Sequence, residues 1–239
     1  MENIKLEGRT IEPHYGRNID KAPALLARWK RGEGYIPSEA DVRLMGVRNF
    51  KNAPEIVTNY WDTSTLSATK GDVVKVILPY DNSGSHELTV VAEFCLGLIN
   101  PKERLVNGGI PLDVDNRWEK LNGSGVYTLK RKGLILNQDL TEEQAMQHPL
   151  ILTKLGHPDH VGSKFARSKD EVAEIIGKTF ELGEGQQGYD TMMGQYLPDE
   201  SKKGVMKAWY ACRLNSRAWS YAGTNLCDVN GRFAFVTPN

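Results

Sequence analysis

The chain has 239 residues, of which 40% are hydrophobic and 25% are charged, so it can form a folded core and is too apolar for a disordered chain. Lysine plus arginine number 30, and aspartate plus glutamate also number 30. The resulting formal net charge of zero argues against a protein built mainly to hold a nucleic acid, and three widely spaced cysteines do not make a disulfide framework.

The first seventy residues are predicted to be helical and rich in loops. Asp20 is a suitable cap for a helix over residues 20–31, because its side chain can accept a free backbone N–H of the first turn. Ser38 predicts the start of a second, shorter helix, since it is followed three residues later by Asp41. Residues 49–70 show no clear period and are expected to be irregular.

The middle of the chain predicts a β-sheet. Residues 72–98 are expected to form an antiparallel hairpin, because two apolar runs flank a polar loop rich in serine and asparagine. A further strand is expected over residues 126–136. Several strands without long helices between them favour a mixed or antiparallel sheet, and with the flanking helices they predict the α+β class.

The last hundred residues are predicted to be mainly helical. Helices are expected near residues 169–182 and 201–221, since both stretches carry apolar side chains at helical spacing. Ser168 is the predicted cap of the first of these, and Thr141 is the predicted cap of a short helix over residues 142–147. A C-terminal hairpin is expected over residues 226–237. Asn230-Gly231 would form its turn, because this pair readily takes the positive φ values of a tight hairpin turn.

The chain is predicted to be a single globular domain over residues 1–239. A subdivision near residue 138 is the alternative, with a helix-plus-sheet part over 1–138 and a helical part with the hairpin over 139–239. No signal peptide and no long apolar segment are evident, so the protein is expected to be soluble and intracellular, with no membrane partner.

The densest group of metal-binding side chains is His157-Pro158-Asp159-His160. Two imidazoles and a carboxylate within four residues are ligand types that zinc or manganese accept. His157, Asp159 and His160 are therefore candidate ligands of a divalent metal, the one cofactor that the sequence suggests. The alternative is a polar loop with exposed histidines.

A second candidate site lies in the predicted helix over 201–221. On a helical wheel Tyr210, Arg213 and Arg217 fall together, and guanidinium groups beside an aromatic ring can hold a phosphate or a carboxylate. These three residues are predicted to bind an anion or a partner. They could instead pair with the acidic stretch over residues 139–200 inside the fold.

No nucleophile elbow, phosphate-binding P-loop or H-E-x-x-H zinc motif is present, which argues against an enzyme without excluding one. The favoured hypothesis is a non-catalytic binding or structural protein whose partner is a protein or a small anionic ligand. One alternative is a metal-dependent hydrolase that uses the His157–His160 segment. A second alternative is a nucleic-acid-binding protein that uses the basic C-terminal helix.

Overall fold

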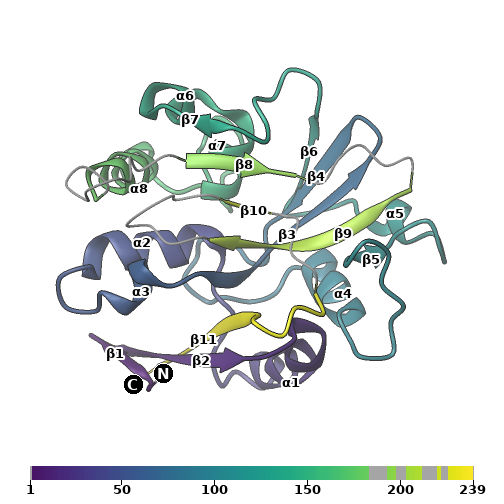
Figure 1. Ribbon diagram of the computed structural model, residues 1–239, viewed down its shortest axis with the longest axis horizontal. Coiled ribbons are helices and arrows are strands. Elements are labelled where there is room, and N and C mark those ends of the chain that lie inside the picture. The colour runs from purple at the N-terminus through teal and green to yellow at the C-terminus, as the bar shows by residue number, and fades with distance from the viewer. Residues whose placement is uncertain (1, 183–192, 198–202, 212–219, 222–225, 239) are drawn as a thin grey trace.

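The computed structural model describes residues 2–182, 193–197, 203–211, 220–221 and 226–238 (Figure 1). It confirms the α+β class, with helices packed on a mixed sheet. The helices are α1 (Asn18–Lys30), α2 (Glu39–Asn49), α3 (Glu55–Thr58), α4 (Val90–Leu98), α5 (Arg117–Lys120), α6 (Glu142–Gln147), α7 (Pro149–Leu155) and α8 (Lys169–Glu181). The strands are β1 (Ile4–Leu6), β2 (Arg9–Tyr15), β3 (Trp61–Lys70), β4 (Val73–Ile77), β5 (Ile110–Pro111), β6 (Val126–Lys130), β7 (Asp139–Leu140), β8 (Met193–Tyr196), β9 (Val205–Ala211), β10 (Ser220–Tyr221) and β11 (Arg232–Pro238).

The main path of the sheet runs β1-β2-β11-β3-β9-β10-β8-β7, with β4, β5 and β6 attached beside it. The pairs β11–β3 and β10–β8 are parallel, and the other pairs are antiparallel. Strand β11 lies between β2 and β3, so the C-terminal part of the chain is held by the N-terminal part. This pairing places Pro238 opposite Arg9.

Strand β3 is buried along nearly its whole length, although its sequence is rich in hydroxyl side chains. The hydroxyl of Thr63 donates to the carbonyl of Trp209, and the hydroxyl of Ser64 donates to the carbonyl of Ile36. Buried hydroxyls that are paired in this way cost little. The predicted irregular stretch over 49–70 was therefore wrong, because distant backbone groups satisfy the polar side chains of a central strand.

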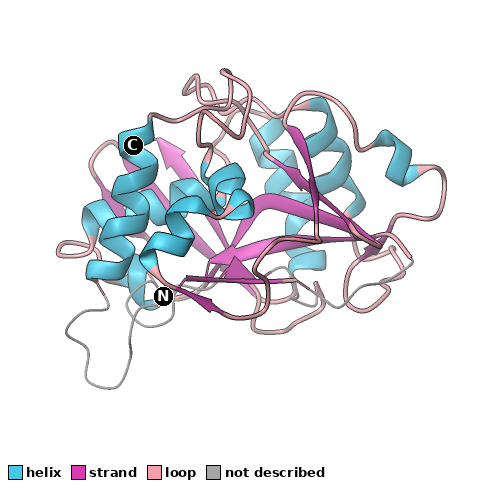
Figure 2. Ribbon diagram, turned by 90° about the horizontal axis from the view of Figure 1, so that it is seen from above, coloured by secondary structure: helices cyan, strands magenta, loops and turns pink. Residues whose placement is uncertain are grey.

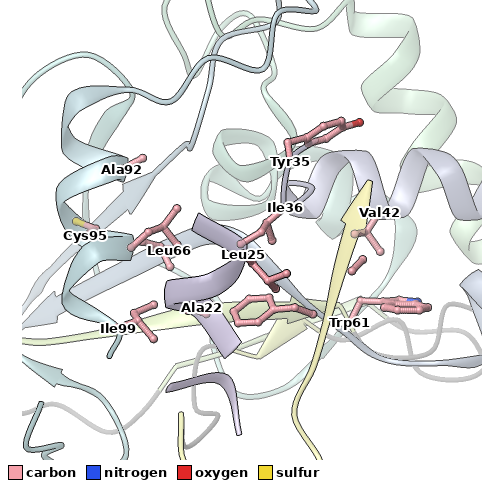
Figure 3. Packing of buried hydrophobic residues seen from close by; sticks show 14 of the residues in the cluster. Ala22, Leu25, Tyr35, Ile36, Val42, Trp61, Leu66, Ala92, Cys95 and Ile99 are labelled. Atoms are coloured by element: carbon pink, nitrogen blue, oxygen red, sulfur yellow. The ribbon is translucent and has the colours of Figure 1, made fainter. Parts of the chain in front are cut away.

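The helices gather in two groups with strands running between them (Figure 2). Helices α1 and α4 pack on each other, whereas α2, α6, α7 and α8 pack together elsewhere. The largest apolar cluster joins α1, α4, β3 and β11, and Figure 3 shows Leu25, Leu66 and Cys95 among its members.

Three predicted helix starts are confirmed. Ser38 and Thr141 each begin a helix with a capping box, and Ser168 accepts the backbone N–H of Glu171 at the start of α8. The predicted helix over 20–31 is confirmed as α1. The helices after Ser38, Thr141 and Ser168 were predictable because each cap lies within three residues of the group that it satisfies. The predicted cap of α1 was wrong, since α1 begins after Arg17 without a side-chain cap and Asp20 lies inside its first turn.

The predicted helix over 201–221 is wrong wherever the structure describes it. Residues 205–211 form β9 and residues 220–221 form β10, while residues 212–219 lie outside the described part. Strand β9 pairs with β3 and is buried on both faces, with Met206 and Ala208 on one face and Lys207 and Trp209 on the other. A strand covered on both faces lacks alternating polarity, so its sequence resembles a buried helix.

The predicted hairpin over 72–98 is half wrong. Strand β4 forms as expected, but residues 90–98 form helix α4, whose first turn is capped because Thr89 Oγ1 accepts the N–H of Ala92. The strand β4 pairs instead with β3 and β6. The strand predicted over 126–136 ends at Lys130.

The predicted C-terminal hairpin over 226–237 is also wrong, since β11 pairs with β2 and β3 rather than with residues 226–229. Neither Asn230 nor Gly231 has a positive φ. Glycine is required at 231 for a different reason: a Cβ atom there would lie 2.7 Å from the carbonyl oxygen of Gly16.

Candidate ligand-binding pocket

The site with the clearest potential to bind a ligand is a cavity of about 670 Å³ between the start of β2, the turn after α1 and the loop over residues 81–89. Its walls include the aromatic side chains of Trp29, Tyr35 and His86. Its size is that of a small-molecule site. We refer to it as the aromatic pocket.

The aromatic rings of this pocket pack on one another in a defined order. The imidazole of His86 stacks on Tyr35 with 3.7 Å between ring centroids and 13° between planes. Tyr80 lies behind them, edge-on to Tyr35 at 5.6 Å and to His86 at 5.0 Å, and Trp29 is 5.6 Å from Tyr80. Because each ring is fixed by its neighbours, the wall is rigid before any ligand arrives.

The backbone of His86 is held in a left-handed conformation, with φ of 53°. The indole N–H of Trp29 donates to the carbonyl of His86 at 2.8 Å. The bridge between Tyr80 and Leu88 closes the base of this loop. A non-glycine residue in this conformation is uncommon and often marks a functional site.

A buried ion pair supports the aromatic wall from behind. Tyr80 donates its hydroxyl hydrogen to Asp41, which also accepts from Arg167 at 2.5 Å. Burial alone would raise the pKa of Asp41, but the Arg167 guanidinium and the hydrogen bonds from Tyr80 and Ser38 hold it below its ordinary value. The Tyr80 ring is thereby fixed at its outer end as well.

Burial also decides the protonation of the rings in the wall. It lowers the pKa of His86, although the Asp41 carboxylate acts in the opposite direction. It also raises the pKa of Tyr35, although the Arg9 guanidinium acts in the opposite direction. At neutral pH the wall is therefore neutral, and its charge comes only from residues at the edge of the cavity.

Four charged residues of the described chain line the pocket: Arg9, Lys30, Glu87 and Glu93. Lys30 and Glu93 form an ion pair with 2.5 Å between Nζ and Oε1. Neither Arg9 nor Glu87 has an ion-pair partner in the part of the chain that the structure describes. The pocket thus offers one guanidinium and one carboxylate beside a neutral aromatic wall.

The structure places His157 and His160 near each other, with ring centroids 5.7 Å apart. Asp159 Oδ2 is 3.9 Å from His157 Nδ1, but it is closer to Lys169 Nζ, at 2.8 Å. Among the described residues, no three histidine, cysteine or acidic side chains are arranged to hold a metal ion. A divalent metal at His157, Asp159 and His160 stays a prediction.

The helix that was predicted to carry Tyr210, Arg213 and Arg217 is not formed at Tyr210, which belongs to strand β9. Arg213 and Arg217 lie outside the described residues. The anion or partner site predicted at these three positions therefore stays a prediction that the geometry does not address.

A second group of charges is buried away from the pocket. Glu39 lies between Arg43 at 3.0 Å and Lys154 at 2.9 Å, and the Lys154 ammonium sits 3.6 Å from the ring centroid of Trp209. Burial lowers the pKa of Lys154 to about 8. Ser220 of β10 donates its hydroxyl hydrogen to Glu39, so this group joins α2, α7 and two strands of the sheet.

Sequence reasoning missed the aromatic pocket. The local signal was the Gly32-x-Gly34-Tyr35 turn, in which Gly34 approaches the backbone of Val236 so closely that a Cβ would lie 2.2 Å from its carbonyl oxygen. This glycine pattern predicts that another part of the chain approaches the turn closely, but it does not identify that part. Residues as distant as Arg9 and His86 meet only through the tertiary fold.

Comparison with known proteins matches no family model and no curated protein. A solved structure described as "Accommodation of massive sequence variation in Nanoarchaeota by the C-type lectin fold" is similar to the chain, with a TM-score of 0.58 and 14% identity over 97% of each chain. No helix in the described residues is long and apolar enough to cross a membrane. The likeness shows that the chain has a C-type lectin-like fold.

Proposed function

We propose that the chain is a non-catalytic binding protein that holds a small ring-bearing molecule in the aromatic pocket. The observation that carries the proposal is the wall of Trp29, Tyr35 and His86, which is already packed and faces a cavity of about 670 Å³. A ligand ring that adds to such a wall gains burial and ring–ring contact without ordering the protein first.

The description of the similar structure is consistent with this proposal. It states that the C-type lectin fold accommodates massive sequence variation in Nanoarchaeota. A fold that tolerates such variation in that protein does not fix the ligand, so the ligand of this chain is argued from its own side chains. The predicted partner, a protein or a small anionic ligand, is narrowed here to a small molecule with a ring.

The test uses three ring-bearing probes, namely phenol, indole and benzimidazole, added to the full chain while its ¹H–¹⁵N amide resonances are recorded. We expect at least one probe to shift the resonances of Tyr35 and of the loop over 81–89. The matched variants are His86→Ala, which removes a ring of the wall, and His160→Ala, which removes an imidazole elsewhere.

Loss of one ring contact is worth about 0.5–1.5 kcal/mol, so His86→Ala is expected to weaken probe binding about 2- to 13-fold. His160→Ala is expected to bind as the unmodified chain does. Equal binding to both variants, or no shift with any of the three probes, would exclude the aromatic pocket as the binding site.

A further inference from the structure

The charged residues at the edge of the aromatic pocket indicate which class of ring-bearing ligand fits it. This inference rests on the proposed function. Lys30 and Glu93 neutralise each other across 2.5 Å. Arg9 and Glu87 are the remaining charged residues of the described lining, and no ion pair within the described chain engages either of them. The pocket therefore has one cationic and one anionic group left for a ligand.

Arg9 is positioned to donate hydrogen bonds to an acceptor group of a ligand. It lies at the start of β2, where pairing with Pro238 of β11 fixes its backbone, and it lines the cavity beside Tyr35. A guanidinium has five N–H donors in a planar fork, so most of its donors stay available. A carboxylate is the acceptor that matches this fork with two parallel hydrogen bonds.

Glu87 is the complementary group. It follows His86 in the loop that the Trp29 indole and the Tyr80–Leu88 bridge hold in place. Its side chain is exposed to solvent, and as a carboxylate it only accepts hydrogen bonds. A protonated amine supplies the charge and the donors that it lacks.

We infer that the ligand is a zwitterion with a planar ring, of the class of an aromatic α-amino acid. The ring packs on the aromatic wall, the α-carboxylate pairs with Arg9 and the α-ammonium pairs with Glu87. A nucleotide or other polyanion does not fit this arrangement, because it would bring several negative charges beside Glu87 and the Lys30–Glu93 pair. A purely cationic ring compound would leave Arg9 without an acceptor.

The experiment compares four probes that share a phenyl ring and differ in the charged groups that they carry. They are L-phenylalanine with both charges, 3-phenylpropionate with the anion, phenethylamine with the cation and N-acetylphenylalaninamide with neither. Binding of each to the full chain is measured by isothermal titration calorimetry and by ligand-observed NMR. We expect L-phenylalanine to bind about 10-fold or more tightly than each of the other three, since each lost charged hydrogen bond weakens binding by that order.

Two variants assign the charges. Arg9→Gln is expected to weaken L-phenylalanine and 3-phenylpropionate and to leave phenethylamine unchanged. Glu87→Gln is expected to weaken L-phenylalanine and phenethylamine and to leave 3-phenylpropionate unchanged. Arg104→Gln and Glu143→Gln remove exposed charges outside the pocket, and they are expected to bind all four probes as the unmodified chain does.

The outcomes separate the two proposals. If all four probes bind equally, or if the variants do not follow the charge pattern, the zwitterion inference is wrong while ring binding in the pocket stands. If none of the four binds but indole or phenol still shifts the pocket resonances, the zwitterion inference again fails alone. If no ring compound of either set binds, both proposals fail.

Discussion

The imidazole of His86 lies flat on the ring of Tyr35, with 3.7 Å between centroids and 13° between planes. This contact connects the loop before α4 to the turn after α1, and it completes the wall of the aromatic pocket. The left-handed backbone of His86 costs free energy, so the stacking and the hydrogen bond from Trp29 must offset that cost. The loop is therefore held by the same rings that we propose as the ligand's contact surface.

His86 should make the chain sensitive to acid. Burial lowers its pKa below the ordinary value of 6.5, so the unfolded chain takes up a proton first as the pH falls. The contribution of neutral His86 is then fully present above pH 6.5 and is lost as the pH falls below it. We expect His86→Phe, which keeps a ring, to lose less stability than the unmodified chain between pH 7.5 and pH 5, as measured by urea unfolding.

His86→Ala is the companion variant, because it removes both the ring and the titrating group. At pH 7.5 it should be less stable than His86→Phe by about 1 kcal/mol, the typical worth of one aromatic contact. If the unmodified chain and His86→Phe lose the same stability on acidification, His86 is not a source of the acid sensitivity.

Two glycines in the turn beside Tyr35 should respond differently to a methyl group. In Gly34→Ala the new Cβ would lie 2.2 Å from the carbonyl oxygen of Val236, at a φ of 150°. In Gly32→Ala the φ is 75° and no atom lies within 4 Å of the new Cβ. We expect a loss of about 1 kcal/mol for Gly32→Ala from backbone strain alone, and about 3 kcal/mol or more for Gly34→Ala.

Thermal unfolding of both variants measures this difference. The hydrogen bonds between Tyr35 and Val236, at 2.9 Å and 2.8 Å, should be the ones disturbed in Gly34→Ala. Equal melting temperatures for the two variants would contradict the close approach of this turn to β11.

The sequence predicted those elements whose stabilising partners are near in the chain. Ser38, Thr141 and Ser168 each cap a helix through a residue three positions away, and all three helices were found. Strand β3 was missed because the partners of Thr63 and Ser64 lie far away in the chain. A polar strand that is satisfied at long range has no local signal that separates it from a loop.

The aromatic pocket could not be predicted from the sequence for the same reason. Its parts are an arginine of β2, a tyrosine after α1 and a histidine before α4, and none of them is notable in its own segment. The segment 90–98 was predicted as a strand because its apolar residues form a nearly continuous run, in which a buried strand and a buried helix look alike. Because of that error, the loop over 81–89 was predicted to be a hairpin turn, and its part in the wall of the aromatic pocket was not recognised.

The buried Glu39–Lys154 pair should be strongly coupled. Both side chains are almost fully buried and lie 2.9 Å apart. Glu39→Gln should destabilise the fold by about 3–5 kcal/mol, because it leaves the cations of Arg43 and Lys154 buried without the Glu39 carboxylate. Lys154→Met should cost less, because Glu39 keeps Arg43 as a partner at 3.0 Å. The double variant should be more stable than the sum of the two losses predicts.

A double-mutant cycle from urea unfolding measures that coupling. The matched control is the exposed pair Lys178–Glu181, at 2.5 Å, for which Lys178→Met and Glu181→Gln should each change stability by less than about 1 kcal/mol. Additive losses at Glu39 and Lys154 would show that the buried pair does not act as a unit.

Asp62 should be a buried acid that destabilises the fold at neutral pH. It accepts the backbone N–H of Arg232 at 2.7 Å, so it ties β3 to the start of β11. Burial raises its pKa to about 6 from an ordinary value of 3.8. Between these two pH values the folded chain holds the proton more tightly than the unfolded chain, so the stability falls as the pH rises and the loss is complete above about pH 6.

Asp62→Asn removes the charge and keeps an acceptor oxygen for the Arg232 N–H. The variant should therefore be more stable than the unmodified chain at pH 7.5, by up to about 3 kcal/mol, and the gain should shrink towards pH 4. Asp115→Asn changes an exposed carboxylate and should show neither effect. Urea unfolding of the three proteins at pH 7.5 and pH 4 decides the point: a pH-independent difference at Asp62 would mean that its carboxyl is ionised in the fold at both pH values. In that case the acceptor of the Arg232 N–H, which joins β3 to β11, would be a carboxylate and not a protonated carboxyl group.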